Sequence, residues 1–246
     1  MTNHINLGTP TRYDFALPRV RHRLSRPFLP EGPSAGRLLD FGCGNGANTV
    51  LYAGDFATVD GVDVEAERVA EAVAAAADLG LANVTYQVYD GEQLPFEDEV
   101  FDHVTSYEVL EHTADDAAAV AEIRRVLRPG AAATISVPNK WYLMETHGFE
   151  LPPAWMRWNR VPFMSWLPTP VHERYARARI YTKRRIVALL EQGGFEVLAH
   201  DYIMPPFDKV QQPVVKRTLE GTFAAVERSP LRVTGVAHFV AARKRR

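Results

Sequence analysis

The feature that most constrains this chain of 246 residues is the segment Asp40-Phe41-Gly42-Cys43-Gly44-Asn45-Gly46, which continues a short apolar run that begins at Leu38. Three glycines in five positions allow the backbone to turn sharply and let a ligand approach closely. A buried strand that leads into such a turn is typical of a parallel sheet in an α/β domain. The segment also fits the pattern G-x-G-x-x-A, with Ala47 in the last place, which occurs where dinucleotides bind.

The rest of the chain repeats this alternation of strands and helices. Between Gly36 and Asn139 we expect five strands, near residues 38–41, 57–62, 84–89, 101–106 and 132–137. Helices are expected over 47–52 and 65–79, and from a cap at Asp115 or Asp116 to Leu127. After a break of about forty residues, a helix near 182–191 and strands at 195–203 and 236–242 complete the pattern.

Acidic residues stand at the ends of the first three expected strands. Asp40 ends the first, Asp63 follows the second, and Asp90 follows the third beside Gly91. The carboxyl ends of parallel strands meet at one edge of the sheet, where open α/β folds bind ligands. A carboxylate in the place of Asp63 can accept hydrogen bonds from both hydroxyls of a ribose.

Composition limits the possible partners and location. The formal net charge of −2 gives no overall attraction to nucleic acid, and the only dense basic run is Arg243-Lys244-Arg245-Arg246. The single cysteine, Cys43, excludes an internal disulfide and fits a cytoplasmic protein. No apolar run reaches transmembrane or signal-peptide length. The eight histidines show no paired spacing, so no metal site is predicted.

Four further segments make the pattern specific. They are Asp90-Gly91-Glu92-Gln93-Leu94-Pro95-Phe96, Phe101-Asp102, Val109-Leu110-Glu111-His112 and Arg125-Val126-Leu127-Arg128-Pro129-Gly130. Together with the glycine segment, and in the same order, they resemble the signatures of class I S-adenosylmethionine (SAM) dependent methyltransferases. The resemblance is to the subfamily that includes quinone-biosynthesis methyltransferases, and it is strong from Gly36 to Asn139.

The resemblance implies a Rossmann-like, doubly wound α/β fold with a seven-stranded, mostly parallel sheet whose last strand is antiparallel. It also implies SAM as the cofactor. Its methionine part would lie on Asp40 and the loop of Gly42, Gly44 and Gly46. The remaining cofactor contacts that it implies are Asp63 and Val64 at the ribose, Asp90, Gly91 and Glu92 at the adenine, and Tyr107 after the fourth strand.

We expect one domain over residues 1–246, with an N-terminal cap segment (1–35), a SAM-binding core (36–140), an insertion (141–180) and the C-terminal part of the sheet (181–246). The insertion holds all four tryptophans, three of the five methionines and five prolines. This composition suits a lid over a small-molecule, apolar or lipid-like acceptor, and it would also suit contact with a membrane surface. An ordinary aromatic flap that packs on the sheet is the alternative.

Methyl transfer from SAM is an in-line displacement, so the protein mainly has to align the two reactants. A general base helps when the acceptor is a hydroxyl. The catalytic candidates are His147 and His172, with Tyr142 and Glu173 as further possibilities in the insertion, whereas a structural role is expected for His112.

Two other functions remain open at this point. The G-x-G-x-x-A match and Asp63 also fit a nicotinamide-dependent oxidoreductase, but that function gives no role to Asp40 or to the segment from Asp90 to Phe96. A non-catalytic SAM-binding protein would keep the cofactor residues and transfer nothing. Neither the methylated atom of the acceptor nor the oligomeric state follows from the sequence.

Overall fold

The computed structural model describes residues 15–32, 36–149, 161–208 and 210–246. Trp155 and Trp158 of the insertion, and the first fourteen residues of the N-terminal segment, lie outside these ranges.

Seven strands form one sheet in the order β3-β2-β1-β4-β5-β7-β6. The strands are β1 (Arg37–Phe41), β2 (Thr58–Asp63), β3 (Val84–Val88), β4 (Phe101–Tyr107), β5 (Leu127–Pro138), β6 (Phe195–Ile203) and β7 (Ala237–Lys244). The first five run parallel, and β7 is antiparallel to both β5 and β6. The predicted seven-stranded, doubly wound sheet is therefore confirmed.

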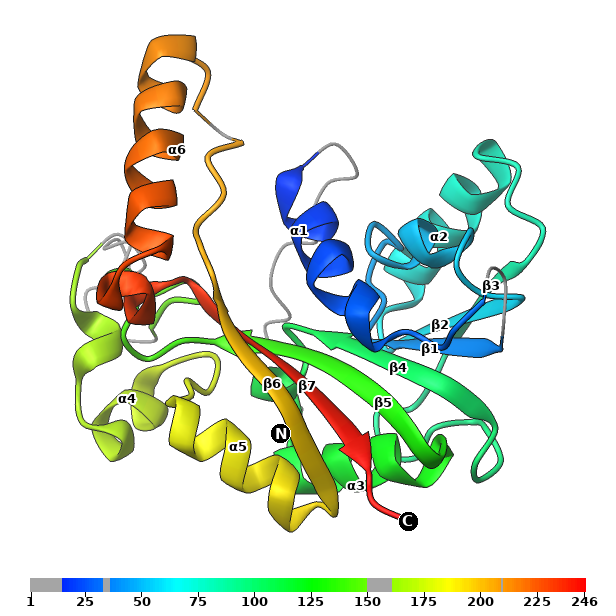
Figure 1. Cartoon of the computed structure of the whole chain (residues 1–246). Coiled ribbons are helices and arrows are strands. Elements are labelled where there is room, and N and C mark those ends of the chain that lie inside the picture. The colour runs from blue at the N-terminus through cyan, green and yellow to red at the C-terminus, as the bar shows by residue number, and fades with distance from the viewer. Residues whose placement is uncertain (1–14, 33–35, 150–160, 209) are drawn as a thin grey trace.

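Helices cover both faces of this sheet (Figure 1). On one face lie α1 (Ala16–Ser25) and α2 (Ala66–Asp78), and on the other lie α3 (Asp116–Val126) and α5 (Lys183–Gln192). Alternate strand residues point to opposite faces, so the buried side chains divide into two clusters. One cluster includes residues of α3 and α5, and the other includes Ala76 of α2 with Leu17, Val20 and Leu24 of α1 packed against it.

The helix predicted over residues 47–52 is wrong, because only a short 3-10 helix, η2 (Thr49–Tyr52), follows the glycine segment. Thr49 and Val50 are β-branched and disfavour an α-helix, and the Thr49 hydroxyl is bound to Asp40. Asp115 does cap α3, since its side chain accepts hydrogen bonds from the backbone N–H groups of Ala117 and Ala118.

Outside the insertion, two helices lie where the sequence pattern suggested none. They are α1 and α6 (Pro213–Glu227), and α6 has no buried residue and extends away from the sheet (Figure 1). The insertion contains η5 (Met164–Trp166) and α4 (Thr169–Tyr175), and a bridge between Asn139 and Tyr181 ties its two ends together. Within the described ranges, no helix has both the length and the apolar character needed to span a bilayer.

A chain of buried hydroxyl groups attaches α1 to the sheet. The Ser25 hydroxyl lies 2.8 Å from that of Tyr52, which lies 2.7 Å from the Tyr107 hydroxyl. Tyr107 continues the chain to Thr134 over 3.0 Å, and Thr134 meets Nε2 of His103 at 3.1 Å. These polar groups are buried, so each depends on its neighbour for a hydrogen bond.

This chain predicts the effect of Tyr52→Phe. Loss of the central hydroxyl removes a buried hydrogen-bond partner from both Ser25 and Tyr107, which should lower the free energy of unfolding by about 1–3 kcal/mol. Urea denaturation measures this change, and Tyr175→Phe in α4, outside the chain, is the matched control. Equal stability of the two variants would show that the hydroxyl chain does not hold α1.

Candidate functional site

The glycine segment forms a loop in which Gly42, Gly44 and Gly46 all have positive φ. A Cβ atom at Gly42 would lie 2.3 Å from the Val109 side chain, and one at Gly46 would lie 2.6 Å from the Tyr86 hydroxyl. A Cβ at Gly44 would meet no atom of the described residues within 4 Å. Packing thus requires glycine at positions 42 and 46, while Gly44 leaves backbone open to a ligand.

Asp40, which lies just before this loop, stabilises it through buried hydrogen bonds. Its carboxylate is buried and accepts hydrogen bonds from the hydroxyls of Thr49, at 2.5 Å, and Thr105, at 2.9 Å. Thr105 is its neighbour in the β1–β4 register, so the pairing of the strands itself places the two groups together. Burial raises the pKa of Asp40 to about 6.

The other two acidic residues lie in the loops that follow β2 and β3. Asp63 accepts hydrogen bonds from the backbone N–H groups of Gly44, at 2.8 Å, and Glu65, at 3.0 Å. Asp90 is exposed and accepts from the backbone of Glu92 and Gln93. A Cβ at Gly91 would lie 3.4 Å from the Val64 side chain, so the two loops are neighbours. The structure therefore brings Gly44, Asp63, Val64 and Gly91 to one edge.

Arg21 of α1 reaches the same edge, although it was not among the residues expected at the site. Its side chain is almost fully buried, lies 3.2 Å from Glu108 Oε1 and stacks over the Tyr107 ring. Nε of Arg21 has no hydrogen-bond partner in the part of the chain that the structure describes. Pro18, Arg21 and Ser25 are the buried residues of α1, and this helical spacing is the signal that could have found it.

Glu108 follows β4 with a φ of 60°, a left-handed conformation that is rare outside glycine. Its Oε1 accepts a hydrogen bond from Ser136 at 2.9 Å in addition to the ion pair with Arg21. The backbone at the end of β4 is thus held in a strained form by side chains of α1 and β5. The Tyr107 side chain points into the buried hydroxyl chain, so only its backbone is available to a cofactor.

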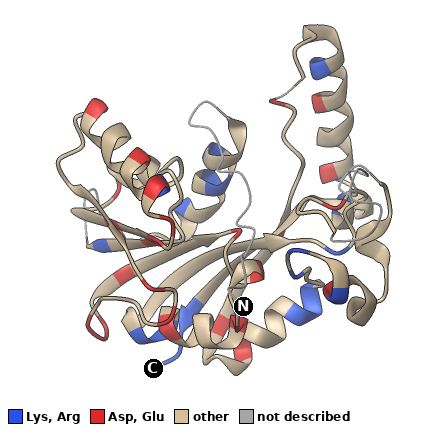
Figure 2. Cartoon of the chain, turned by 180° about the vertical axis from the view of Figure 1, so that it is seen from behind, with Lys and Arg blue, Asp and Glu red and all other residues tan. Residues whose placement is uncertain are grey.

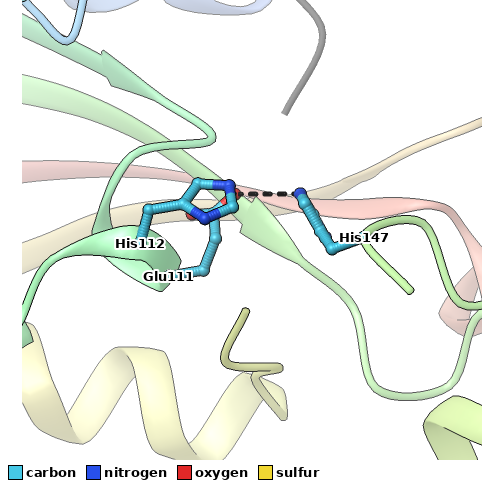
Figure 3. Close-up of side chains that lie close together, drawn as sticks. All are labelled: Glu111, His112 and His147. Carbon is cyan, nitrogen blue, oxygen red and sulfur yellow. Dashed lines mark ion pairs between the residues drawn. The ribbon is translucent and has the colours of Figure 1, made fainter. Parts of the chain in front are cut away.

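Glu111, His112 and His147 form a compact group (Figure 3). Glu111 and His112 belong to η3 (Leu110–His112), and His147 comes from the segment after β5. Nε2 of His147 lies 3.8 Å from Glu111 Oε1, and the two imidazole rings are 4.8 Å apart in an edge-to-face arrangement. One nitrogen or oxygen from each residue lies within 4.8 Å of the others, a spacing that a metal ion could bridge.

Within this group, Glu111 has an unusual environment for a carboxylate. Glu111 is buried, and among the described residues neither of its oxygens has a hydrogen-bond partner. Burial and the neighbouring Glu108 raise the pKa of Glu111 well above its usual range. Burial and His147 lower the pKa of His112 to about 4, so this imidazole is neutral at pH 7. The expectation of no metal site was based on spacing along the sequence, which does not detect residues brought together by folding.

The other predicted catalytic residues lie away from this group. His172 is fully buried in α4, and its Nε2 lies 2.7 Å from Glu145 Oε2. Burial raises the pKa of Glu145, but hydrogen bonds from His172 and from the backbone of His147 outweigh it, and the net pKa is lowered. Glu173 pairs with Arg185 of α5. Of the two histidines predicted as catalytic, only His147 joins the group with Glu111.

Comparison with known proteins gives one matching family, described as a methyltransferase domain, over residues 39–135. A ubiquinone biosynthesis O-methyltransferase of Dinoroseobacter shibae is 30% identical over 196 residues, which covers 78% of this chain and 73% of that protein. A similar enzyme of Ruegeria sp. is 29% identical over 194 residues, covering 77% of this chain and 72% of its own.

Solved structures share the fold. A SAM-dependent methyltransferase from Mesorhizobium loti has a TM-score of 0.62 at 19% identity, covering 90% of this chain and 96% of its own. Phosphoethanolamine N-methyltransferase 2 of Haemonchus contortus, solved with S-adenosyl-L-methionine, has a TM-score of 0.62 at 20% identity. The match covers 93% of this chain and 53% of the Haemonchus contortus chain.

The buried carboxyl of Asp40 predicts a pH-dependent stability. Its pKa of about 6 in the folded chain exceeds its ordinary value of 3.8, so its contribution to folding is complete below pH 4 and is lost as the pH rises through 6. The free energy of unfolding of the wild type, relative to Asp40→Asn, should fall by up to about 3 kcal/mol between pH 4 and pH 7. Denaturant titrations across this range measure it, with Asp78→Asn on the exposed side of α2 as control. A pH-independent difference would contradict the assignment.

Proposed function

Because the chain belongs to the SAM-dependent methyltransferases and its cofactor is SAM, we propose that it transfers the methyl group of SAM to a hydroxyl of a small, largely apolar acceptor. One observation carries this proposal. Gly42 packs directly against Val109, so the glycine loop lies next to the short helix that bears Glu111 and His112. The glycine loop and the group formed by Glu111, His112 and His147 therefore meet at one edge of the sheet. Since the chain belongs to the methyltransferases, a nicotinamide-dependent oxidoreductase is no longer considered.

We assign the cofactor contacts as follows. Asp63, with Val64, binds the ribose hydroxyls, while Asp90, Gly91 and Glu92 surround the adenine. The backbone around Gly42, Gly44 and Gly46 receives the methionine part, with Asp40 fixing the loop and Tyr107 contributing backbone. The closeness of Asp63 to the open Gly44 backbone supports this arrangement.

We add Arg21 to this set. Its positive charge favours the ionised forms of both Asp40 and Glu111, and its side chain contacts Glu108 and the Tyr107 ring at the end of β4. A buried guanidinium with a donor that the described residues leave unpaired suits the carboxylate of the methionine part.

The group of Glu111, His112 and His147 serves the acceptor in this proposal. These residues fit a divalent cation, because both buried oxygens of Glu111 lack a hydrogen-bond partner among the residues described and the neighbouring His112 imidazole is neutral at pH 7. A bound cation would lower the pKa of an acceptor hydroxyl and so favour its attack on the methyl group. The protein itself aligns acceptor, methyl and sulfur, an effect that can contribute roughly 7–11 kcal/mol. The O-methyltransferases at about 30% identity support a hydroxyl as the acceptor.

The insertion supports an apolar acceptor. Trp141, Leu143, Phe163 and Trp166 each expose 42–52% of their surface, and the Trp166 ring contacts both Trp141 and Phe163. Exposed aromatic side chains that touch one another suit a lipid-like molecule or the surface of a membrane that contains it. We therefore propose peripheral membrane contact through these residues, with the insertion as the acceptor-binding lid. Nucleic acid is not expected as a partner, since the formal net charge is −2 and acidic and basic residues are interspersed along the ribbon (Figure 2).

Asp63→Ala tests the cofactor assignment. Removal of the charge-assisted hydrogen bonds to the ribose should cost about 1.5–3 kcal/mol and weaken SAM at least tenfold in calorimetry. Asp78→Ala, an exposed substitution in α2, should bind SAM like the wild type. Equal affinity of wild type and Asp63→Ala would remove Asp63 from the site.

The transfer itself is tested by incubating the protein with SAM and with metabolite and lipid extracts. Mass spectrometry should find a product one methyl group heavier, enriched in the lipid fraction. Glu111→Gln should keep the SAM affinity and lower the rate at least a hundredfold, a loss typical of removing acid–base or Lewis-acid assistance. Tight SAM binding without any methylated product would instead support the non-catalytic alternative.

A further inference from the structure

Glu145 and His172 form a buried pair that the proposed reaction does not use. Both side chains are almost completely excluded from solvent, and Nε2 of His172 lies 2.7 Å from Glu145 Oε2. The His172 ring also packs edge-to-face on Phe149 at 5.0 Å. Burial of a carboxylate is costly even when it is paired, so a pair of this kind suggests a role beyond stability.

The two oxygens of Glu145 bind different segments. Oε2 meets His172 of α4, whereas Oε1 accepts a hydrogen bond from the backbone N–H of His147 at 3.0 Å. One carboxylate therefore fixes the backbone of His147 relative to α4. It links the insertion to the group that contains Glu111.

The same carboxylate lies beside the His147 ring. Glu145 Oε1 is 3.9 Å from Nδ1, and the Thr146 hydroxyl lies 3.0 Å from that nitrogen. The negative charge of Glu145 on this side of the ring favours a proton on Nδ1, and the Thr146 hydroxyl can accept a hydrogen bond from that N–H. The lone pair of the neutral ring is then on Nε2, the atom that lies 3.8 Å from Glu111 Oε1.

We infer that Glu145, held by His172, is a positioning residue that fixes His147 with its proton on Nδ1 and its Nε2 lone pair directed at Glu111. The use that His147 makes of this lone pair, as a ligand to a divalent cation, rests on the proposed function. The orientation and the tautomer depend on the contacts of Glu145 and Thr146 and need no cation. Partners of this kind behind a metal-binding histidine typically contribute 10- to 100-fold to metal affinity.

Glu145→Gln tests the inference, because it keeps the shape and the acceptor for the His147 backbone but removes the charge. Ring nitrogen chemical shifts of His147 in ¹⁵N NMR report its tautomer, and calorimetry with Zn²⁺ alone reports cation affinity. The wild type should show the Nδ1–H form. Glu145→Gln should lose this preference and bind Zn²⁺ 10- to 100-fold more weakly, with SAM affinity unchanged. Glu173→Gln, in the same insertion, should match the wild type in both measurements.

The outcomes separate the inference from the proposed function. A wild type whose His147 carries its proton on Nε2 would overturn the inference, and so would a folded Glu145→Gln variant with wild-type tautomer and Zn²⁺ affinity. If the wild type binds no Zn²⁺, the cation part of the proposed function fails, and the tautomer comparison alone decides the inference. If Glu145→Gln does not fold, the wild-type tautomer decides it.

Discussion

The contact between Gly42 and Val109 is the constraint on which the site depends. No side chain larger than that of glycine fits there, because a Cβ would approach Val109 within 2.3 Å. The contact exists only while the loop keeps its shape, and Asp40 maintains that shape through Thr49 and Thr105. Asp40 thus supports the loop that packs on Val109, next to the helix that bears Glu111 and His112, while Asp63 binds the N–H of Gly44.

The site concentrates buried charge, which a fold tolerates only where partners or ligands compensate it. Glu108 lies near Glu111, Asp40 is buried under the glycine loop, and the positive charge of Arg21 acts on both Asp40 and Glu111. Glu108 pairs with Arg21, but the oxygens of Glu111 have no hydrogen-bond partner among the described residues. An unsatisfied buried carboxylate is rare in a structural core and common at functional sites, where a ligand completes it. This difference is why we place the acceptor chemistry at Glu111 rather than at Asp40.

The sequence predicts the sheet well because its signals are local. Apolar runs, Asp115 as a helix cap and the glycine loop each act within a few residues, and the structure confirms the strands and the antiparallel β7. The sequence does not predict the group of Glu111, His112 and His147, because the fold of the insertion is what brings His147 close to Glu111. Spacing along the sequence could not reveal the contact between His147 and Glu111. Nor could it reveal that His172 binds Glu145 instead of joining the site. Arg21 was missed for a related reason, since no helix was expected over residues 16–25 and a charged residue is normally assigned to solvent.

The central claim is that the reacting end of the cofactor faces Glu111, His112 and His147. A crystal structure with S-adenosylhomocysteine tests it most directly, because the sulfur marks the position from which the methyl group leaves. We predict that the sulfur lies beside these three residues, with the ribose on Asp63 and the carboxylate on Arg21. A sulfur that points away from them, toward another surface, would contradict the account.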